Sequence, residues 1–324
     1  MSKNIKNFAL GLIFCFIFFG FLNLFDEKIR QGFFCDKNSI KTASIQGKII
    51  RENQKEFVER KKENLNIEAR GAISVFENKN GTKKILFQKN EENKFPIASI
   101  TKLMTAYVVL NNYCLEDSVK ISNNAIDKEG RNKHLKQGQI LSVKDLLYPL
   151  LVESNNGAAY ALADSNGLRE KEFVNLMNYT AQKTGLNNTY FFNSTGLDLD
   201  KNKGNKVPVN YSTCNDLAKF ISHLLNQKSK NNEIIWDIAS MPSVNFADFK
   251  LINTNKFLGG QLNWQKEIIG GKTGFTYRAK ECFILVVETP DHKGFFINII
   301  LGAKDRFKEM EKLVDYDLLV YKKQ

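Results

Sequence analysis

The sequence predicts an α+β fold in which an antiparallel sheet, built from both ends of the folded region, packs against helices that include a helical subdomain. Two short apolar strands come first, at 71–77 and 83–88. The middle of the chain has apolar residues at helical spacing, and strand patterns return only at 281–289 and 294–303. A doubly wound parallel sheet would instead show strands and helices in steady alternation. The order of the elements therefore favours one sheet that joins the two ends of the domain.

Turn signals and helix boundaries support each of these elements. The first two strands should form a hairpin, because Asn80-Gly81 between them is a strong signal for a tight turn. The segment 290–294, rich in turn-forming residues, should join the two late strands. Gly185 is placed to end a helix. Helices are predicted from a start at Ser99 and over 142–154, 157–164, 170–185, 212–227 and 305–322.

The first 65 residues are predicted to lie outside the folded domain. Phe8 to Phe25 is an 18-residue apolar run, and Lys3 and Lys6 before it favour a cytoplasmic N-terminus. No small-residue cleavage site follows the run, so an uncleaved anchor is favoured over a cleaved signal peptide. We therefore expect a short cytoplasmic tail and membrane anchor at 1–25, a charged stalk or linker at 26–65 and a folded domain at 66–324. This domain would face the outside of the cell membrane.

Composition excludes several classes of function. The formal net charge is +12, from 47 basic and 35 acidic residues, and a basic surface can favour nucleic acid, anionic lipid or an acidic polymer. No nucleic-acid-binding motif accompanies the charge, so no nucleic-acid partner is predicted. The five cysteines and three histidines show no metal-ligand spacing, so no metal site is predicted. Nothing in the sequence indicates an oligomeric state.

A lysine three residues after a serine stands at the mouth of an otherwise apolar helix. Ser99 and Lys102 would point the same way, because residues three apart share a helix face. A serine hydroxyl is a poor nucleophile without a base in hydrogen-bond reach, and a lysine with a lowered pKa can be that base. Taken alone, the pair is explained better by a capped helix with one solvated lysine than by a catalytic site.

Two further motifs follow in the same chain. Ser154-Asn155-Asn156 gives S-x-N after a predicted helix end, 55 residues beyond Ser99, and Lys272-Thr273-Gly274 lies 118 residues further on, before the late strands. Each could be a simple cap or turn. Three chance matches in this order are much less probable, and the set is the one associated with penicillin-binding proteins and serine β-lactamases.

The chain resembles the D-alanyl-D-alanine carboxypeptidases, which are low-molecular-mass penicillin-binding proteins, over about residues 68–322. Besides the three motifs, the segments 173–198, 209–220 and 253–258 are similar to family segments. The resemblance implies a fold like that of the serine β-lactamases and DD-peptidases. Two departures are Gly157, where an acidic residue often follows S-x-N, and Lys280, which replaces a glycine that is usual in the family.

The resemblance implies a serine-type D-Ala-D-Ala carboxypeptidase that removes the terminal D-alanine from peptidoglycan stem peptides. Ser99 would attack the carbonyl between the two terminal D-alanines, and Lys102 would take its proton. Ser154 would relay a proton to the leaving D-alanine, while Asn156 would steer Lys102 and the substrate amide. β-Lactams would be covalent inhibitors, and no cofactor would be needed.

The resemblance also implies a binding site for the substrate around the third motif. Lys272 would pair with the terminal carboxylate, aided by the hydroxyl groups of Thr273 and Thr276. The next two residues after Thr273, Gly274 and Phe275, complete the predicted site. The backbone N–H groups of Ser99 and Phe275 would form an oxyanion hole, a feature that typically lowers a barrier by about 3–4 kcal/mol.

Three alternatives share parts of this pattern. A D,D-endopeptidase of peptidoglycan cross-links uses the same residues on another substrate, and the sequence leaves it open. A class A β-lactamase needs a glutamate for deacylation, and neither Glu172 nor Glu233 has the Glu-x-x-x-Asn context of that residue. A membrane-bound β-lactam sensor needs an intracellular signalling part, whereas only seven residues precede the apolar run. The carboxypeptidase is therefore the preferred hypothesis.

Overall fold

The computed structural model describes residues 65–130, 134–198, 208–226, 229–260 and 262–322. The predicted anchor and all but the last residue of the predicted stalk lie outside the described residues. Among the helices that are described, none combines the length and the apolar character needed to cross a bilayer. The elements are β1 (Gly71–Asn78), β2 (Lys83–Lys89), β3 (Phe95–Pro96), η1 (Ala98–Ile100), α3 (Thr101–Asn112), β4 (Ser118–Lys120), α4 (Asn123–Ile126), β5 (Ile140–Ser142), α5 (Val143–Leu151), α6 (Asn156–Ala163), α7 (Glu170–Lys183), β6 (Tyr211–Ser212), α8 (Cys214–Asn226), α9 (Lys230–Ala239), β7 (Ser243–Phe246), β8 (Phe249–Ile252), η3 (Lys256–Gly259), η4 (Gln265–Glu267), β9 (Ile268–Thr276), β10 (Lys280–Glu288), β11 (Gly294–Ala303) and α10 (Arg306–Tyr321).

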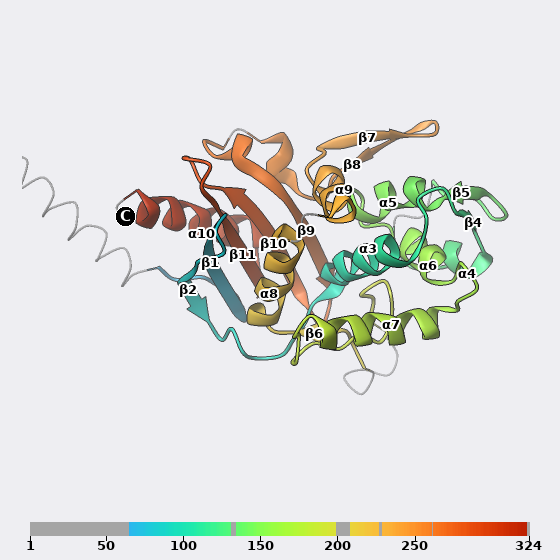
Figure 1. Cartoon of the computed structure of the whole chain (residues 1–324), viewed down its shortest axis with the longest axis horizontal. Helices are drawn as coiled ribbons and strands as arrows, with labels where there is room; N and C mark the ends of the chain where they lie inside the picture. The colour runs from blue at the N-terminus through green and yellow to red at the C-terminus, as the bar shows by residue number, and fades with distance from the viewer. Residues whose placement is uncertain (1–64, 131–133, 199–207, 227–228, 261, 323–324) are drawn as a thin grey trace, which may run out of the picture. The chain divides into compact units, whose positions relative to one another are not determined.

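One antiparallel sheet joins the two ends of the domain, as predicted. Its strand order is β2-β1-β11-β10-β9, so that the first strand of the domain pairs with the last, from Gly71 opposite Leu301 to Asn78 opposite Gly294. Figure 1 shows this sheet on one side of the molecule and a helical region around α3, α5 and α6 on the other. The predicted α+β class is confirmed.

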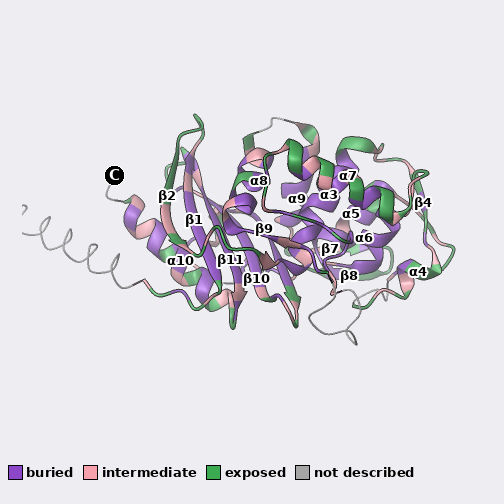
Figure 2. Ribbon diagram, turned by 90° about the horizontal axis from the view of Figure 1, so that it is seen from below, coloured by how far each residue is buried: buried purple, intermediate pink, exposed green. Residues whose placement is uncertain are grey.

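Both faces of the sheet are covered, which explains why the late strands are apolar at nearly every position. In β10, Phe283 and Leu285 face the cluster that contains α10, whereas Ile284 and Val286 face the larger cluster of the helical region. Because successive side chains point to opposite faces, a strand buried on both sides needs apolar residues in an unbroken run. Figure 2 shows the central strands as almost wholly buried.

Local signals in the sequence place several element boundaries. The hairpin β1–β2 turns at Gly81, whose φ of 89° is a conformation that glycine adopts without strain. Ser142 caps α5 in a capping box with Asp145, and the Asp305 carboxylate caps α10 through the N–H groups of Phe307 and Lys308. The two late strands and the final helix lie within one residue of their predicted ends.

Three features differ from the prediction. The segment that contains Lys272-Thr273-Gly274, for which no strand was predicted, forms the edge strand β9; its three glycines weaken the strand pattern, and pairing with β10 stabilises it. The helix predicted to end at Ser154 ends at Leu151, which leaves S-x-N in a loop between α5 and α6. Ser99 does not cap α3: it lies in η1, and no side chain caps the helix.

A carboxyl group is buried between α10 and the sheet. Asp317 is fully buried, and its Oδ1 accepts a hydrogen bond from the Ser74 hydroxyl at 2.6 Å. Burial raises the pKa of this carboxyl to about 7, although the hydrogen bond from Ser74 and the nearby Asn298 side chain act in the opposite direction. An unfolded aspartate has a pKa of about 3.9, so the folded chain binds the extra proton between about pH 4 and 7. The free energy of unfolding should therefore fall as the pH rises through this window.

Asp317→Asn should remove this contribution to the pH dependence. Because three pKa units correspond to about 4 kcal/mol, we expect the variant to gain about 2–4 kcal/mol in the free energy of unfolding at pH 8 and little at pH 4. Urea unfolding at the two pH values measures the difference. Asp237→Asn, at an exposed position on α9, is the control and should behave as the wild type. If the free energy of unfolding of Asp317→Asn depends on pH as in the wild type, other groups cause the pH dependence.

Candidate active site

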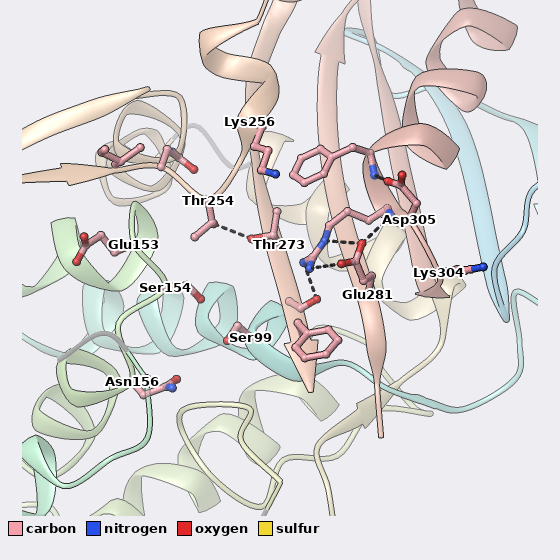
Figure 3. Close-up of a pocket in the computed structure, with 17 residues that line it drawn as sticks. Ser99, Glu153, Ser154, Asn156, Thr254, Lys256, Thr273, Glu281, Lys304 and Asp305 are labelled. Atoms are coloured by element: carbon pink, nitrogen blue, oxygen red, sulfur yellow. Dashed lines mark hydrogen bonds and ion pairs between the residues drawn. The ribbon is translucent and has the colours of Figure 1, made fainter. Parts of the chain in front are cut away.

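The three motifs meet at one cavity of about 870 Å³ between the sheet and the helical region. Ser99 comes from η1, Ser154 and Asn156 from the α5–α6 loop and the start of α6, and the third motif from β9. Figure 3 shows the side chains of Ser99 and Ser154 close together beside the edge strand that carries Thr273. The predicted residues that line the cavity are Ser99, Ser154, Asn156, Thr273, Gly274 and Phe275.

Lys102 lies beneath this cavity and contacts the predicted nucleophile. Its Nζ is 2.8 Å from the Ser99 Oγ, and it donates hydrogen bonds to the Asn156 Oδ1 and the Thr195 carbonyl oxygen, both at 2.6 Å. The side chain is fully buried. A neutral amine has two N–H groups and one lone pair, so the two oxygens would occupy the N–H groups and leave the lone pair for the Ser99 hydroxyl.

Electrostatics favour that neutral form. Burial lowers the pKa of Lys102 well below its usual value, and the positive charge of Lys272 lowers it further. Burial also lowers the pKa of Lys272, to about 7, with a smaller contribution from the Arg306 guanidinium. The site therefore combines a lysine that can accept a proton with a second lysine whose charge an anionic ligand would stabilise.

The S-x-N segment is held in a specific conformation. Ser154 has a φ of 63°, which is uncommon for a residue with a side chain and is often found at functional sites. Asn155 caps α6 by accepting a hydrogen bond from the Ala158 N–H at 2.9 Å. The Asn156 amide donates to the Glu129 carbonyl, which fixes its oxygen toward Lys102. The segment thus places one hydroxyl and one amide beside the serine–lysine pair.

The edge strand supplies the opposite wall. Lys272 is almost fully buried, and its Nζ donates to the Thr273 carbonyl at 3.0 Å. The Thr273 hydroxyl faces Thr254, with 2.6 Å between the two oxygens. Gly274 permits close contact with the turn that bears the nucleophile, since a Cβ there would lie 3.0 Å from the Ser99 nitrogen. A backbone this close can present N–H groups to an oxygen at Ser99.

Thr276 occupies a different position from the other predicted residues. Its hydroxyl donates to Asp198 at 3.0 Å and accepts from the Ala279 N–H, and it is not among the residues that line the cavity. Lys280, one of the two departures from the family pattern, follows in this turn with a φ of 60°. A glycine there would avoid the strain that a side chain incurs in this conformation.

The structure adds residues that the motifs do not reveal. Arg306, at the start of α10, lines the cavity, donates to the Gly274 carbonyl at 2.7 Å and forms an ion pair with Glu281 at 3.2 Å. Thr195 supplies the carbonyl that orients Lys102, and Thr254 pairs with Thr273. Thr195 and Thr254 lie in segments with family resemblance, whereas Arg306 has no motif around it and is found only through the packing of α10.

In this α+β domain, a serine at a helix start contacts a buried lysine, opposite an S-x-N loop and a K-T-G edge strand. This arrangement is typical of the active-site serine penicillin-binding fold. The chain belongs to the D-alanyl-D-alanine carboxypeptidase family, whose model matches residues 57–305. This match includes all three motifs.

Individual relatives agree with the family. The chain is 28% identical to D-alanyl-D-alanine carboxypeptidase DacF of Bacillus subtilis over 78% of this chain and 63% of that protein. It is 31% identical to a D-alanyl-D-alanine endopeptidase of Escherichia coli over 63% of each. The chain therefore spans slightly less than two thirds of the length of these curated relatives. Penicillin-binding protein D2 of Listeria monocytogenes, solved in its ampicillin-bound form, has a TM-score of 0.62 and 31% identity, covering 78% of this chain and 98% of that one.

Proposed function

We propose that this chain is a serine-type D-Ala-D-Ala carboxypeptidase that removes the terminal D-alanine from peptidoglycan stem peptides. The observation that carries the proposal is the contact of Ser99 with a buried Lys102 of lowered pKa, within a chain of this family. A serine beside a neutral amine can form an acyl-enzyme without a metal or a cofactor, as in the Ser-Lys variants of serine hydrolases.

In the proposed acylation, the Ser99 Oγ attacks the scissile carbonyl carbon while its proton passes to the Lys102 Nζ. The C–N bond then breaks: Ser154 gives its hydroxyl proton to the amine of the leaving D-alanine and takes in exchange the proton that Lys102 received from Ser99. Water hydrolyses the resulting ester and restores Ser99. Asn156 keeps the Lys102 Nζ directed at the serine through their 2.6 Å contact. Ser154 fits the relay because its strained backbone places it in the cavity beside Ser99.

Recognition of the free chain end is assigned to the edge strand. The substrate carboxylate would lie near Lys272 and Thr273, with Arg306 as a further cation on the same wall. A carboxylate close to Lys272 would raise the pKa of that lysine again and keep it protonated. The oxyanion formed during attack would accept hydrogen bonds from the N–H groups of Ser99 and Phe275.

β-Lactams are expected to acylate the same serine. Support comes from penicillin-binding protein D2 of Listeria monocytogenes, which was solved in an ampicillin-bound form and matches 78% of this chain. In this chain the ring carbonyl of a penicillin would occupy the place of the scissile amide, with Ser99 forming the ester.

Cleavage of D,D cross-links is the second candidate. Relatives named D-alanyl-D-alanine endopeptidases are 31% and 32% identical to this chain. Glu153 and Lys256 also line the cavity of about 870 Å³, and a leaving group larger than D-alanine would lie against them. The same catalytic groups would act on either substrate, so the difference would lie in this part of the cavity.

Mass spectrometry of two substrates tests the proposal. The full-length chain in detergent should convert a pentapeptide stem to a tetrapeptide with release of D-alanine, and Ser99→Ala should not. A cross-linked muropeptide dimer in a parallel reaction should remain intact if the carboxypeptidase is the main activity. Cleavage of the dimer alone would favour the endopeptidase, and cleavage of neither would contradict both.

The membrane location is a separate proposal. The apolar run from Phe8 to Phe25, preceded by Lys3 and Lys6, supports a single-pass anchor with the catalytic domain outside the cytoplasm. We expect the protein to remain with membranes after a carbonate wash and to keep its N-terminus, as read by N-terminal sequencing. A soluble form that begins after the run would show cleavage and contradict the anchor.

A glycine outside the three motifs should be needed for acylation. Gly196 has a φ of 83°, and a Cβ there would lie 2.0 Å from the Ala98 carbonyl oxygen, beside the nucleophile. Gly167 has a similar φ of 80° but faces open space, so Gly167→Ala is a control for backbone strain alone. We expect Gly196→Ala to slow acylation by fluorescent penicillin by about 100-fold, because small misplacements of catalytic groups are costly.

Thermal unfolding would show what fraction of each glycine variant is folded. Gly167→Ala should lose about 1 kcal/mol of stability and acylate at the wild-type rate. Equal acylation rates for the two folded variants would mean that the contact between Gly196 and Ala98 has no role in placing Ser99.

A further inference from the structure

A group of three aromatic rings, two exposed and one half-buried, lies outside the catalytic cavity. Tyr190 and Phe192 are 43% and 36% exposed, and their ring centroids are 4.8 Å apart. Tyr211 of β6 lies 6.4 Å from Tyr190 and 6.5 Å from Phe192, and the Lys94 ammonium stands 5.4 Å from its centroid. We call these three rings and Lys94 the aromatic platform. Contiguous exposed apolar side chains are uncommon on soluble surfaces and often mark a binding site.

The platform has a fixed backbone. Tyr190 and Tyr211 form an antiparallel bridge with hydrogen bonds of 3.0 and 3.1 Å in the two directions. The Phe192 N–H donates to the buried Asn210 side chain at 2.7 Å. Rings held on a fixed backbone lose little conformational freedom when a ligand binds, which favours affinity.

The segment that carries Tyr190 and Phe192 continues to Thr195, which contacts Lys102 in the active site. Its side chains alternate, so that Tyr190 and Phe192 point outward while Phe191 and Asn193 are buried. Asn193 Oδ1 accepts a hydrogen bond from the Thr195 N–H at 3.1 Å, and the Thr195 carbonyl orients Lys102. A ligand on the platform would therefore contact the exposed side of the segment 190–195, whose buried side contacts Lys102 through Thr195.

We propose that the aromatic platform binds the glycan strands of peptidoglycan and so brings attached stem peptides to Ser99; this proposal rests on the proposed function. Each sugar ring has an apolar face of C–H groups that can stack on an aromatic ring, with hydroxyl groups at its edge. Lys94 would attract the carboxylates of the attached stem peptides, or the lactyl carboxylates at sugars from which the peptide has been removed. A net charge of +12 favours the approach of such an acidic polymer.

The composition of the platform favours a glycan over a lipid surface or a protein. Its exposed apolar members are rings only, whereas the exposed isoleucines of the described residues, Ile85, Ile140 and Ile252, lie on β2, β5 and β8. Rings beside a cation, with no exposed isoleucine among them, suit a ligand that combines flat C–H faces with carboxylates, as a glycan strand with its attached peptides does.

Co-sedimentation with insoluble glycan strands, stripped of their peptides by an amidase, tests the proposal with the full-length chain in detergent. We expect Tyr190→Ala/Phe192→Ala to weaken binding at least about tenfold, because each lost ring removes a stacking contact. Tyr190→Leu/Phe192→Leu should weaken it similarly, whereas Phe192→Tyr should bind as the wild type. Ile85→Ala/Ile140→Ala, which removes exposed apolar area elsewhere, is the matched control and should bind normally.

Turnover of a short soluble stem peptide separates this proposal from the proposed function. All these variants should cleave it at wild-type kcat/KM and lose efficiency only on intact peptidoglycan. A wild type that binds glycan without cleaving the peptide would refute the catalytic assignment alone. Glycan binding that is absent in the wild type, or equal in wild type and the alanine variant, would overturn the platform. The proposal would also be overturned if the leucine variant kept its glycan binding. The same holds if the alanine variant, tested in parallel on phosphatidylglycerol vesicles, lost binding to the vesicles and not to glycan, because either result would indicate a general apolar contact.

Discussion

Ser99→Ala should abolish covalent labelling by fluorescent penicillin and lower kcat for a pentapeptide stem by at least about 10⁴-fold. The size follows from the loss of the nucleophile, since serine hydrolases keep only the catalysis that binding and oxyanion stabilisation supply without it. Labelled wild-type protein, digested and analysed by mass spectrometry, should carry the penicillin on Ser99. Label on any other residue would mean that the catalytic roles are wrongly assigned.

The alanine variant should still fold, which makes its inactivity informative. The Ser99 side chain makes one contact with Lys102, and that lysine keeps its hydrogen bonds to Asn156 and Thr195 when the hydroxyl is removed. Unfolding temperature should therefore change little. Ser118→Ala, at an exposed position of β4, is the matched control and should be labelled at the wild-type rate.

Lys272→Ala should lower kcat/KM for a stem ending in D-Ala-D-Ala by at least about tenfold. A tenfold loss corresponds to about 1.4 kcal/mol of transition-state stabilisation. Removal of one partner of a desolvated charge pair costs about 2–5 kcal/mol, because the other charge is left without its partner. Lys256→Ala is the control, since Lys256 also lines the cavity but is exposed. It should cause a much smaller loss.

A second substrate separates recognition of the carboxylate from other roles of Lys272. An analogue with an amidated chain end lacks the negative charge, so Lys272→Ala should harm its turnover much less. The two proteins and two substrates form a double-mutant cycle, in which the difference between the two losses measures the pairing. Equal losses would mean that Lys272 acts on proton transfer, for example through the pKa of Lys102, or on folding.

Much of the fold follows from local patterns that need no knowledge of distant contacts. Asn80-Gly81 determines a hairpin, and the apolar runs at 281–289 and 294–303 are long enough to be strands whatever they pair with. The strand at 268–276 was not predicted because its glycines have low strand propensity, and only pairing with β10 stabilises it. The hairpin β7–β8 and helix α9 likewise depend on packing against the helical region.

The sequence by itself indicated the candidate chemistry of this protein, because Ser99 and Lys102 are close enough in sequence to meet through local geometry, across the junction of η1 and α3, and because S-x-N and K-T-G follow them in order. It could not determine whether Lys102 is neutral. That property depends on burial and on the charge of Lys272, which the fold brings close from the far end of the domain. Arg306 reaches the cavity for the same reason, since α10 packs across the sheet. Only the tertiary structure decides such effects, because desolvation and charge–charge interactions depend on distance in space and not on separation in sequence.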